Sequence, residues 1–246
     1  MTKRKLGPFE IETVGLGCMS LSHSYGPPPS DADGAKLLNR ALDLGYDFLD
    51  TASIYGVGHN ETLIGQALKG RRDEFVLASK CGLRVGNDEA RATRMLDGSP
   101  AGIAEVLDLS LSRLGVDHID LYYLHRLDPK TPIEESVGAL ADAVKAGKIR
   151  SIGLSEVSAA TLRRAAEVHP IAAVQTEYSL WTRNPEIAVL DACRELGTTF
   201  VAFSPVARGF LADGIGDASA LAKGDLRRHM PRFNPPHLEA NLKLLA

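Results

Sequence analysis

The stretches FVLASK at residues 75–80 and IDLYYLH at residues 119–125 decide the fold. Each is apolar at most positions, and each ends in one titratable side chain, Lys80 or His125. Strands with apolar residues on both faces are typical of a parallel sheet that helices cover. The two stretches therefore predict an α/β fold in which polar groups gather where the strands end.

The same alternation of an apolar run and a helical stretch continues along the chain. Seven runs are strand-like, at residues 13–18, 46–52, 75–81, 119–125, 149–155, 172–179 and 199–206. Six stretches are helical, at residues 31–44, 61–69, 101–114, 133–146, 159–169 and 186–196. The helical stretches are amphipathic, with apolar side chains recurring at helical spacing. Residues 215–236, which are rich in Gly, Pro, Asp and Arg, predict a surface loop.

Helix boundaries are marked by particular residues. Glycines that can adopt the left-handed backbone conformation follow four of the helical stretches, at Gly45, Gly115, Gly147 and Gly197. Ser99 and Thr131 each precede a proline, which is typical of a capping residue at a helix start.

Seven strand-helix units without a linker allow two architectures. A doubly wound open sheet would bind a nucleotide at its first turn, whereas a closed α/β barrel has its site at the carboxyl ends of its strands. The first run ends in GLGCMS (residues 15–20), which lacks the third glycine of GxGxxG and is weak evidence for the open sheet. The polar strand ends favour the barrel, as one domain over residues 1–246.

The composition excludes several classes of protein and site. Lys and Arg number 28 against 31 Asp and Glu, so the net charge is −3, and no basic stripe indicates nucleic acid as a partner. No apolar run approaches the ~20 residues of a membrane span. Cys18, Cys81 and Cys193 show no CxxC spacing and the 7 histidines no HExxH spacing, so neither a disulfide framework nor a metal is indicated. We expect a soluble, cytoplasmic protein, and the oligomeric state stays open.

Four titratable side chains, Asp50, Tyr55, Lys80 and His125, stand at or just after strand ends. Each one alone has an ordinary structural explanation, but a lysine at the end of a buried strand must find a carboxylate or lose its charge. Asp50, expected one strand away, is a suitable partner for Lys80. A tyrosine titrates near ~10 and holds its proton at neutral pH, and the ammonium of Lys80 would lower the pKa of Tyr55.

This set of side chains suits the reduction of a carbonyl group. Tyr55 could donate a proton to the carbonyl oxygen as hydride reaches the carbon, with Lys80 and Asp50 as electrostatic support. His125 could orient the carbonyl oxygen or relay a proton to Tyr55. Acyl transfer fits poorly, because no activated serine or cysteine stands beside a base.

The same segments resemble the aldo-keto reductase superfamily. FLDTASIYG (residues 48–56), followed by NETLIG (60–65), is similar to the family's signature around its aspartate and tyrosine. ASK (78–80) and DLYYLH (120–125) are similar to the segments that carry its lysine and histidine. The resemblance covers residues 6–232 and assigns the family's tetrad to Asp50, Tyr55, Lys80 and His125, with Tyr55 as the general acid.

The resemblance implies a TIM-type (β/α)8 barrel whose bottom is closed by an N-terminal β-hairpin, here residues 3–6 and 11–13. It also implies NADPH as the cofactor, with NADH as the alternative, and a small-molecule aldehyde or ketone as the substrate. The loops at residues 21–29, 84–98 and 126–130 would determine which substrate is taken.

Cofactor contacts follow from the same resemblance. Ser155 and Gln175 would bind the carboxamide of the nicotinamide ring, and Tyr178 would stack on the face of the ring. SPVARGFL (residues 204–211) resembles the loop that holds the pyrophosphate. The implied cofactor-binding residues are Met19, Asp50, Ser155, Gln175, Tyr178, Ser204, Pro205, Val206, Arg208, Gly209 and Leu211.

The chain departs from the family's pattern in three places. Glu156 stands where many members have asparagine, and SEVS (residues 155–158) and Trp181 resemble the pyridoxal- and chloroaldehyde-type reductases in particular. Residues 236–246 resemble only part of the family's seventh helix, so we expect a truncated or incompletely recorded sequence. The absent eighth strand-helix unit would carry the groups that hold the adenosine and its 2′-phosphate.

Two other functions stay open. One is a nicotinamide-binding regulatory module with little turnover, like the β subunits of potassium channels; copurification with a membrane partner would favour it. The other is an isomerase or aldolase that uses Lys80 as a Schiff-base nucleophile. Borohydride trapping of a substrate on Lys80 would support this third function.

Overall fold

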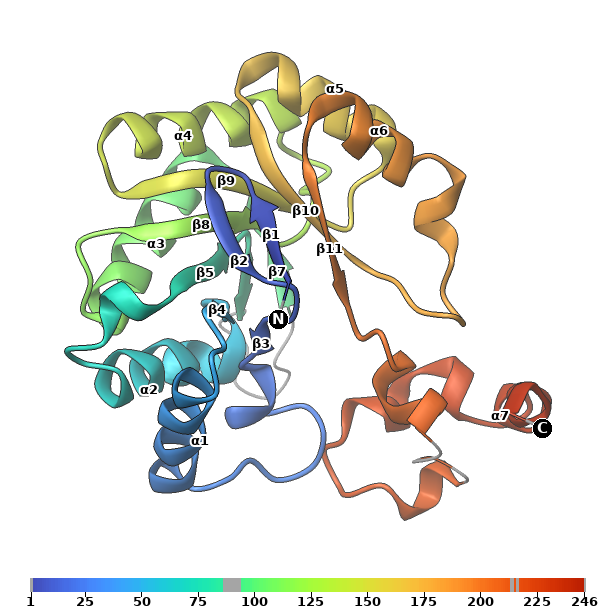
Figure 1. Ribbon diagram of the computed structural model, residues 1–246. Helices are drawn as coiled ribbons and strands as arrows, with labels where there is room; N and C mark the ends of the chain where they lie inside the picture. Colours follow the sequence, from blue (N-terminus) through green and yellow to red (C-terminus); the bar gives the residue numbers. More distant parts are fainter. Residues whose placement is uncertain (1, 86–93, 213–214, 216, 246) are drawn as a thin grey trace.

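The computed structural model describes residues 2–85, 94–212, 215 and 217–245. Within these residues, a parallel seven-stranded sheet runs in the order β11-β10-β9-β8-β5-β4-β3. The strands are β3 Leu16–Gly17, β4 Phe48–Asp50, β5 Val76–Cys81, β8 Ile119–Leu124, β9 Ile149–Ser155, β10 Ile171–Glu177 and β11 Thr199–Phe203. Each lies within one of the seven predicted runs, except that β10 starts one residue earlier. The sheet curls into part of a TIM-type barrel, with helices along its outer face (Figure 1), which confirms the predicted fold class.

In the described part of the chain, six helices alternate with the strands of the sheet. They are α1 Asp31–Asp43, α2 His59–Ala67, α3 Pro100–Leu114, α4 Ile133–Lys145, α5 Ala159–Val168 and α6 Val189–Leu196. Helix α6 starts later than predicted, because Asn184–Ile187 form a 3-10 turn instead. The four glycines predicted at helix ends all have positive φ.

The two predicted hydroxyl caps differ in outcome. Ser99 caps α3, and its Oγ accepts a hydrogen bond from the backbone N of Gly102 at 3.1 Å. The prediction for Thr131 is wrong: Pro132 is the N-cap of α4, and the Thr131 hydroxyl donates to Asp128 Oδ2 at 3.1 Å. The nearby carboxylate competes successfully for the hydroxyl.

Two apolar layers hold the barrel together. The larger one lies between the outer face of the sheet and the helices, and includes Leu77, Ile103 and Ile152. The smaller one fills the concave face, where Leu6 and Leu121 are fully buried in one cluster. Burial of each such side chain contributes about 1.5–3 kcal/mol.

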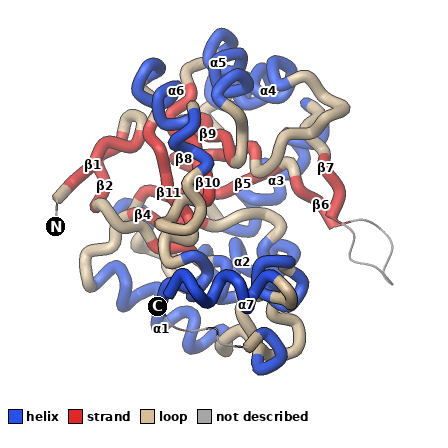
Figure 2. Tube along the Cα trace, turned by 90° about the vertical axis from the view of Figure 1, so that its right-hand side faces the viewer, coloured by secondary structure: helices blue, strands red, loops and turns tan. Residues whose placement is uncertain are grey.

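The inner layer is closed from below by an antiparallel hairpin of β1 (Lys3–Leu6) and β2 (Phe9–Glu12). The backbone N of Glu12 donates to Asp47 Oδ1 at 2.7 Å, and Asp47 directly precedes β4. The hairpin therefore covers the amino ends of the strands, as predicted, although its second strand starts and ends earlier than the predicted residues 11–13. A second hairpin, β6 (Leu83–Val85) with β7 (Arg94–Leu96), projects from the opposite end (Figure 2). Both ends of the barrel are thus marked by a hairpin.

The edge strands β3 and β11 do not pair with each other in the described part of the chain. A cavity of about 830 Å³, here called the seam cavity, lies between them and is lined by residues of both. The curled sheet is therefore open along this side.

The segment after β11 forms a small unit of its own. Residues 215–236, predicted as a loop, contain short 3-10 turns, and α7 (His237–Leu242) follows them. Phe210, Phe233 and Leu238 form a separate apolar cluster here, and the ring of Trp181 stacks on Phe210 with centroids 4.1 Å apart. None of the helices that the structure describes has the length and apolar composition that crossing a bilayer requires.

Candidate active site

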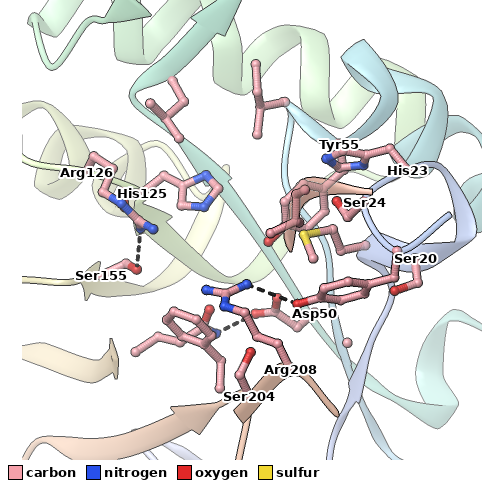
Figure 3. Close-up of a pocket in the computed structure, with 18 of the residues that line it drawn as sticks. Ser20, His23, Ser24, Asp50, Tyr55, His125, Arg126, Ser155, Ser204 and Arg208 are labelled. Carbon is pink, nitrogen blue, oxygen red and sulfur yellow. Dashed lines mark hydrogen bonds between the residues drawn. The ribbon is translucent and has the colours of Figure 1, made fainter. Parts of the chain in front are cut away.

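A cavity of about 630 Å³, here called the central cavity, opens at the carboxyl ends of the strands. Its lining includes the ends of β4, β9, β10 and β11 together with residues of the segments 17–25 and 226–230. In a parallel barrel this end carries the strand-to-helix loops, so side chains from distant parts of the chain meet here. Figure 3 shows them converging on one space.

Lys80 lies on β5 beneath this cavity and is fully buried. Its Nζ donates to a carboxylate oxygen of Asp50, at the end of neighbouring β4, and to the carbonyl oxygen of Thr51 at 2.8 Å. Burial alone would lower the pKa of Lys80, but the charge of Asp50 and the hydroxyl of Tyr55 outweigh it and raise that pKa. Lys80 is therefore an ammonium at neutral pH, paired as predicted.

Tyr55 begins a short turn after β4 and faces the central cavity (Figure 3). Lys80 Nζ lies 5.2 Å from the centroid of the Tyr55 ring. Burial raises the pKa of Tyr55, the ammonium of Lys80 lowers it, and Asp50 raises it. We predicted that Lys80 lowers this pKa; it acts in that direction, but burial outweighs it and the net pKa is raised. The phenol therefore carries its proton at neutral pH.

Two histidines flank Tyr55. The ring of His125, which follows β8, meets it edge-on with centroids 5.8 Å apart, and the ring of His23 lies 5.5 Å away. The structure thus brings all four predicted residues of the tetrad together. It adds His23, which the sequence analysis missed because a single histidine in a loop carries no local signal.

A second group of polar side chains lies across the cavity from Tyr55. Gln175, on β10, donates from Nε2 to Asp50 Oδ2 at 2.7 Å. Arg126, directly after His125, donates from Nη1 to Ser155 Oγ at 3.1 Å (Figure 3). Ser155 and Gln175 therefore lie on the cavity wall with their side chains already oriented by neighbours.

The charged rim of the cavity is built around Arg208. Its guanidinium donates to Tyr25 Oη and to Glu177 Oε2, both at 3.0 Å. Arg232 binds the other oxygen of Glu177 at 2.7 Å. Burial would raise the pKa of Glu177, but the two arginines hold that pKa below its usual value. The loop after β3 and the loop after β11 are thereby linked across the rim.

The predicted cofactor residues divide into two groups. Met19, Asp50, Ser155, Gln175, Ser204 and Arg208 line the central cavity, whereas Tyr178, Pro205, Val206, Gly209 and Leu211 are not part of its lining. Pro205 lines the seam cavity, and Leu211 packs against the small cluster of Phe210. Of the three loops expected to select the substrate, residues 86–93 lie outside the described residues.

Phe203 is among the aromatic residues that line the central cavity, and Tyr178 is not. Tyr178 Oη donates to Glu186 Oε1 at 2.8 Å, and its ring meets Phe200 edge-on at 5.7 Å, away from the cavity. Phe203 is the last residue of β11 and lines the central cavity. An aromatic residue ending a strand, directly before a loop with polar residues, is the signal that could have identified it.

Comparison with known proteins shows which family the chain resembles. Residues 13–246 match the sequence profile of the Aldo/keto reductase family. An aldo-keto reductase of Schizosaccharomyces pombe, whose name specifies NADP(+), is 46% identical over 247 residues, which cover 98% of this chain and 72% of the relative.

Solved structures agree with the sequence comparison. A glycerol dehydrogenase from Gluconobacter oxydans has a TM-score of 0.87 at 33% identity, covering 99% of this chain and 75% of that one. The holo form of an aldo-keto reductase from Bacillus halodurans has a TM-score of 0.77 at 35% identity, covering 86% and 68%. The finer likeness to pyridoxal- and chloroaldehyde-type reductases stays a prediction.

Proposed function

The chain belongs to the aldo/keto reductase family, and on that premise we propose that it reduces aldehydes or ketones to alcohols with NADPH, with Tyr55 as the proton donor. The observation that carries this proposal is the phenol of Tyr55 beside the buried Lys80–Asp50 pair, on the same cavity as His125. A protonated phenol next to an ammonium is suited to giving up its proton when negative charge develops on a nearby oxygen.

Each side chain has a defined task in the proposed reaction. Tyr55 transfers its hydroxyl proton to the carbonyl oxygen. The O–H bond of the phenol breaks, an O–H bond forms on the substrate, and the phenol oxygen takes the negative charge. Lys80 stabilises this phenolate, and Asp50 keeps Lys80 charged and in place. His125, edge-on to the phenol, orients the carbonyl oxygen. A proton donor positioned in this way contributes about 10²–10⁴-fold to the rate.

The chemistry of the cavity fits a nicotinamide cofactor. Bound NADPH would supply the hydride. The amide of Gln175 and the hydroxyl of Ser155 can hydrogen-bond a carboxamide, since a primary amide needs both donors and acceptors. We propose that Phe203 provides the aromatic contact to the ring, and that Ser204 and Arg208 hold the phosphates. The name of the fission-yeast relative supports NADPH over NADH.

A substrate panel tests the proposal. Reduction of small aldehydes and ketones, including glyceraldehyde because one structural neighbour is named a glycerol dehydrogenase, is measured for the parent and for Tyr55→Phe. We expect Tyr55→Phe to lose reduction while its NADPH affinity, read by fluorescence quenching, stays within about twofold. Tyr122→Phe, which removes a buried hydroxyl on the outer face of β8, is the matched control. Equal rates for Tyr55→Phe and the parent would refute Tyr55 as the donor.

A further inference from the structure

Asn60 is fully buried at the start of α2, outside the lining of the central cavity. Its Nδ2 donates to the carbonyl oxygen of Cys18 and to Ser22 Oγ, both at 2.8 Å. Its Oδ1 accepts from the hydroxyl of Thr51 at 2.6 Å. A carboxamide has two N–H donors and one carbonyl oxygen, so every group of this side chain is used. A buried side chain with all of its polar groups engaged has one defined position.

Two of these partners also make backbone hydrogen bonds to the residues of the Lys80–Asp50 pair. The backbone N of Cys18 donates to the carbonyl oxygen of Asp50 at 2.8 Å. The carbonyl oxygen of Thr51 accepts from Lys80 Nζ at 2.8 Å. Asn60 therefore fixes the backbone on both sides of the ion pair, from β3 through Cys18 and from the end of β4 through Thr51.

The third partner holds one wall of the cavity. Ser22 directly precedes His23, whose ring packs beside Tyr55 with centroids 5.5 Å apart. Ser22 Oγ also bonds His59 Nδ1 at 2.8 Å. A Cβ on Gly56 would lie 2.8 Å from the Cβ of Ser22, which shows how closely this wall approaches the turn that carries Tyr55.

We propose that Asn60 is a positioning residue for the reduction: through Thr51 it fixes the ammonium of Lys80 between Asp50 and the phenol of Tyr55. This inference rests on the proposed role of Tyr55 as the proton donor. The attraction between the ammonium and a forming phenolate falls as their distance grows, so a shift of Thr51 weakens the support of the acid. Misplacement by about 1 Å can cost roughly 10²-fold in rate.

Thr51→Val tests the link with the least disturbance. It removes the hydroxyl that donates a hydrogen bond to Asn60 and keeps the size of the side chain. It leaves the backbone carbonyl that accepts a hydrogen bond from Lys80. Thr51→Ser keeps the hydroxyl and is the matched control. Asn60→Ala removes all three bonds, and the double variant shows whether the two residues act through one path.

Thr51→Val and Asn60→Ala are each expected to lower kcat about tenfold, the lower end of the effect of removing a partner that orients a metal ligand. Their effects should overlap in the double variant, and Thr51→Ser should retain most of the parent rate. NADPH affinity should change less than about twofold, because none of the bonds of Asn60 faces the cavity.

The pH profile separates positioning from a purely structural role. Among the described residues, the titratable and charged groups around Tyr55 are Asp50, Lys80, His23, His125 and Arg126. Of these, Lys80 and Arg126 lower the pKa of Tyr55, and only Lys80 bonds Thr51. When Lys80 is less well placed, the phenol holds its proton more tightly, so the alkaline limb of kcat/KM for reduction moves to higher pH.

The deciding experiment measures this alkaline limb for the parent, Thr51→Val, Thr51→Ser and Asn60→Ala, with Tyr55→Phe as a separate arm. We expect a shift to higher pH in Thr51→Val and Asn60→Ala, and none in Thr51→Ser. If the alkaline limb does not move in Thr51→Val while activity still depends on Tyr55, the positioning role of Asn60 is overturned and the role of Tyr55 stands. If Asn60→Ala does not fold, the result for Thr51→Val decides. Parent-level activity in Tyr55→Phe overturns the proposed donor and this inference with it.

Discussion

Gln175 and Asp50, which both line the central cavity, are joined by a hydrogen bond of 2.7 Å from Nε2 to Oδ2, although 125 positions of sequence separate them. Their strands, β10 and β4, are not neighbours in the sheet. The curl of the sheet brings the two side chains together, and Asp50 divides its oxygens between Lys80 and Gln175. The wall proposed to bind the carboxamide is thus connected to the ion pair that supports the proton donor.

Gln175→Met should therefore affect both cofactor binding and chemistry. The variant keeps the bulk of the side chain but removes the amide, so we expect NADPH to bind about tenfold more weakly, which corresponds to about 1.4 kcal/mol. The rate at saturating NADPH should also fall, because Asp50 loses a hydrogen bond. Fluorescence quenching and steady-state rates measure the two effects. Gln66→Met, on the exposed side of α2, controls for the substitution itself, and equal NADPH affinity in the two variants would contradict the assignment.

Lys80→Met should leave Asp50 without its ion-pair partner in a largely buried place. Breaking a buried pair from one side costs about 3–5 kcal/mol, so the free energy of unfolding should fall by several kcal/mol and reduction should be lost. Lys80→Met combined with Asp50→Asn should recover part of the stability but none of the activity. Urea unfolding of the parent and of the two variants checks this, and a Lys80→Met protein as stable as the parent would show that the pair is not buried as described.

The variants Phe203→Leu and Tyr178→Leu test which of two aromatic side chains contacts the cofactor. Phe203 lines the central cavity and Tyr178 does not. We expect Phe203→Leu to weaken NADPH binding about fivefold to tenfold, as the loss of one aromatic contact would, and Tyr178→Leu to leave it nearly unchanged. The reverse order of affinities would support the stacking role that the family resemblance implies for Tyr178.

The lowered pKa of Glu177 predicts that the stability of the folded state depends on pH. Arg232 and Arg208 lower its pKa below the usual 4.5, so its carboxylate stabilises the folded state above pH 4.5. This contribution is lost as the pH falls below 4.5 through the lowered pKa of the folded state. In Glu177→Gln the unfolding midpoint should be lower than that of the parent at pH 7, and the difference should shrink at pH 3.5. Glu239→Gln removes an exposed carboxylate as the control, and a difference that stays constant with pH would contradict the prediction.

Much of the fold could be predicted because the signals were local. Apolar runs such as residues 119–125 specify buried parallel strands wherever they occur, and glycines such as Gly115 mark helix ends by their backbone freedom. The start of α6 and the cap at Pro132 could not, because both depend on competing local hydrogen bonds and turns. The meeting of Asp50, Tyr55, Lys80 and His125 could be expected because they lie at or just after the ends of three strands, β4, β5 and β8, of one barrel.

Other features of the site depend on contacts between distant segments, which residue types and spacing do not reveal. Tyr178 and Phe203 both lie near strand ends, and only the path of the backbone determines which one faces the cavity. The net pKa of Tyr55 could not be predicted either, since the cost of burial depends on how closely the walls around it pack. The bond between Asn60 and Thr51 joins two ordinary polar residues 9 positions apart, and residue type alone does not show that the turn between them brings their side chains together.

The most direct test of the account is the single-turnover rate of NADPH oxidation by an aldehyde, with Tyr55→Phe compared with the parent at saturating cofactor. If Tyr55 donates the proton, the rate should fall at least about 10²-fold, as expected for the loss of a general acid. A Tyr55→Phe rate within a few-fold of the parent would show that the proton comes from elsewhere.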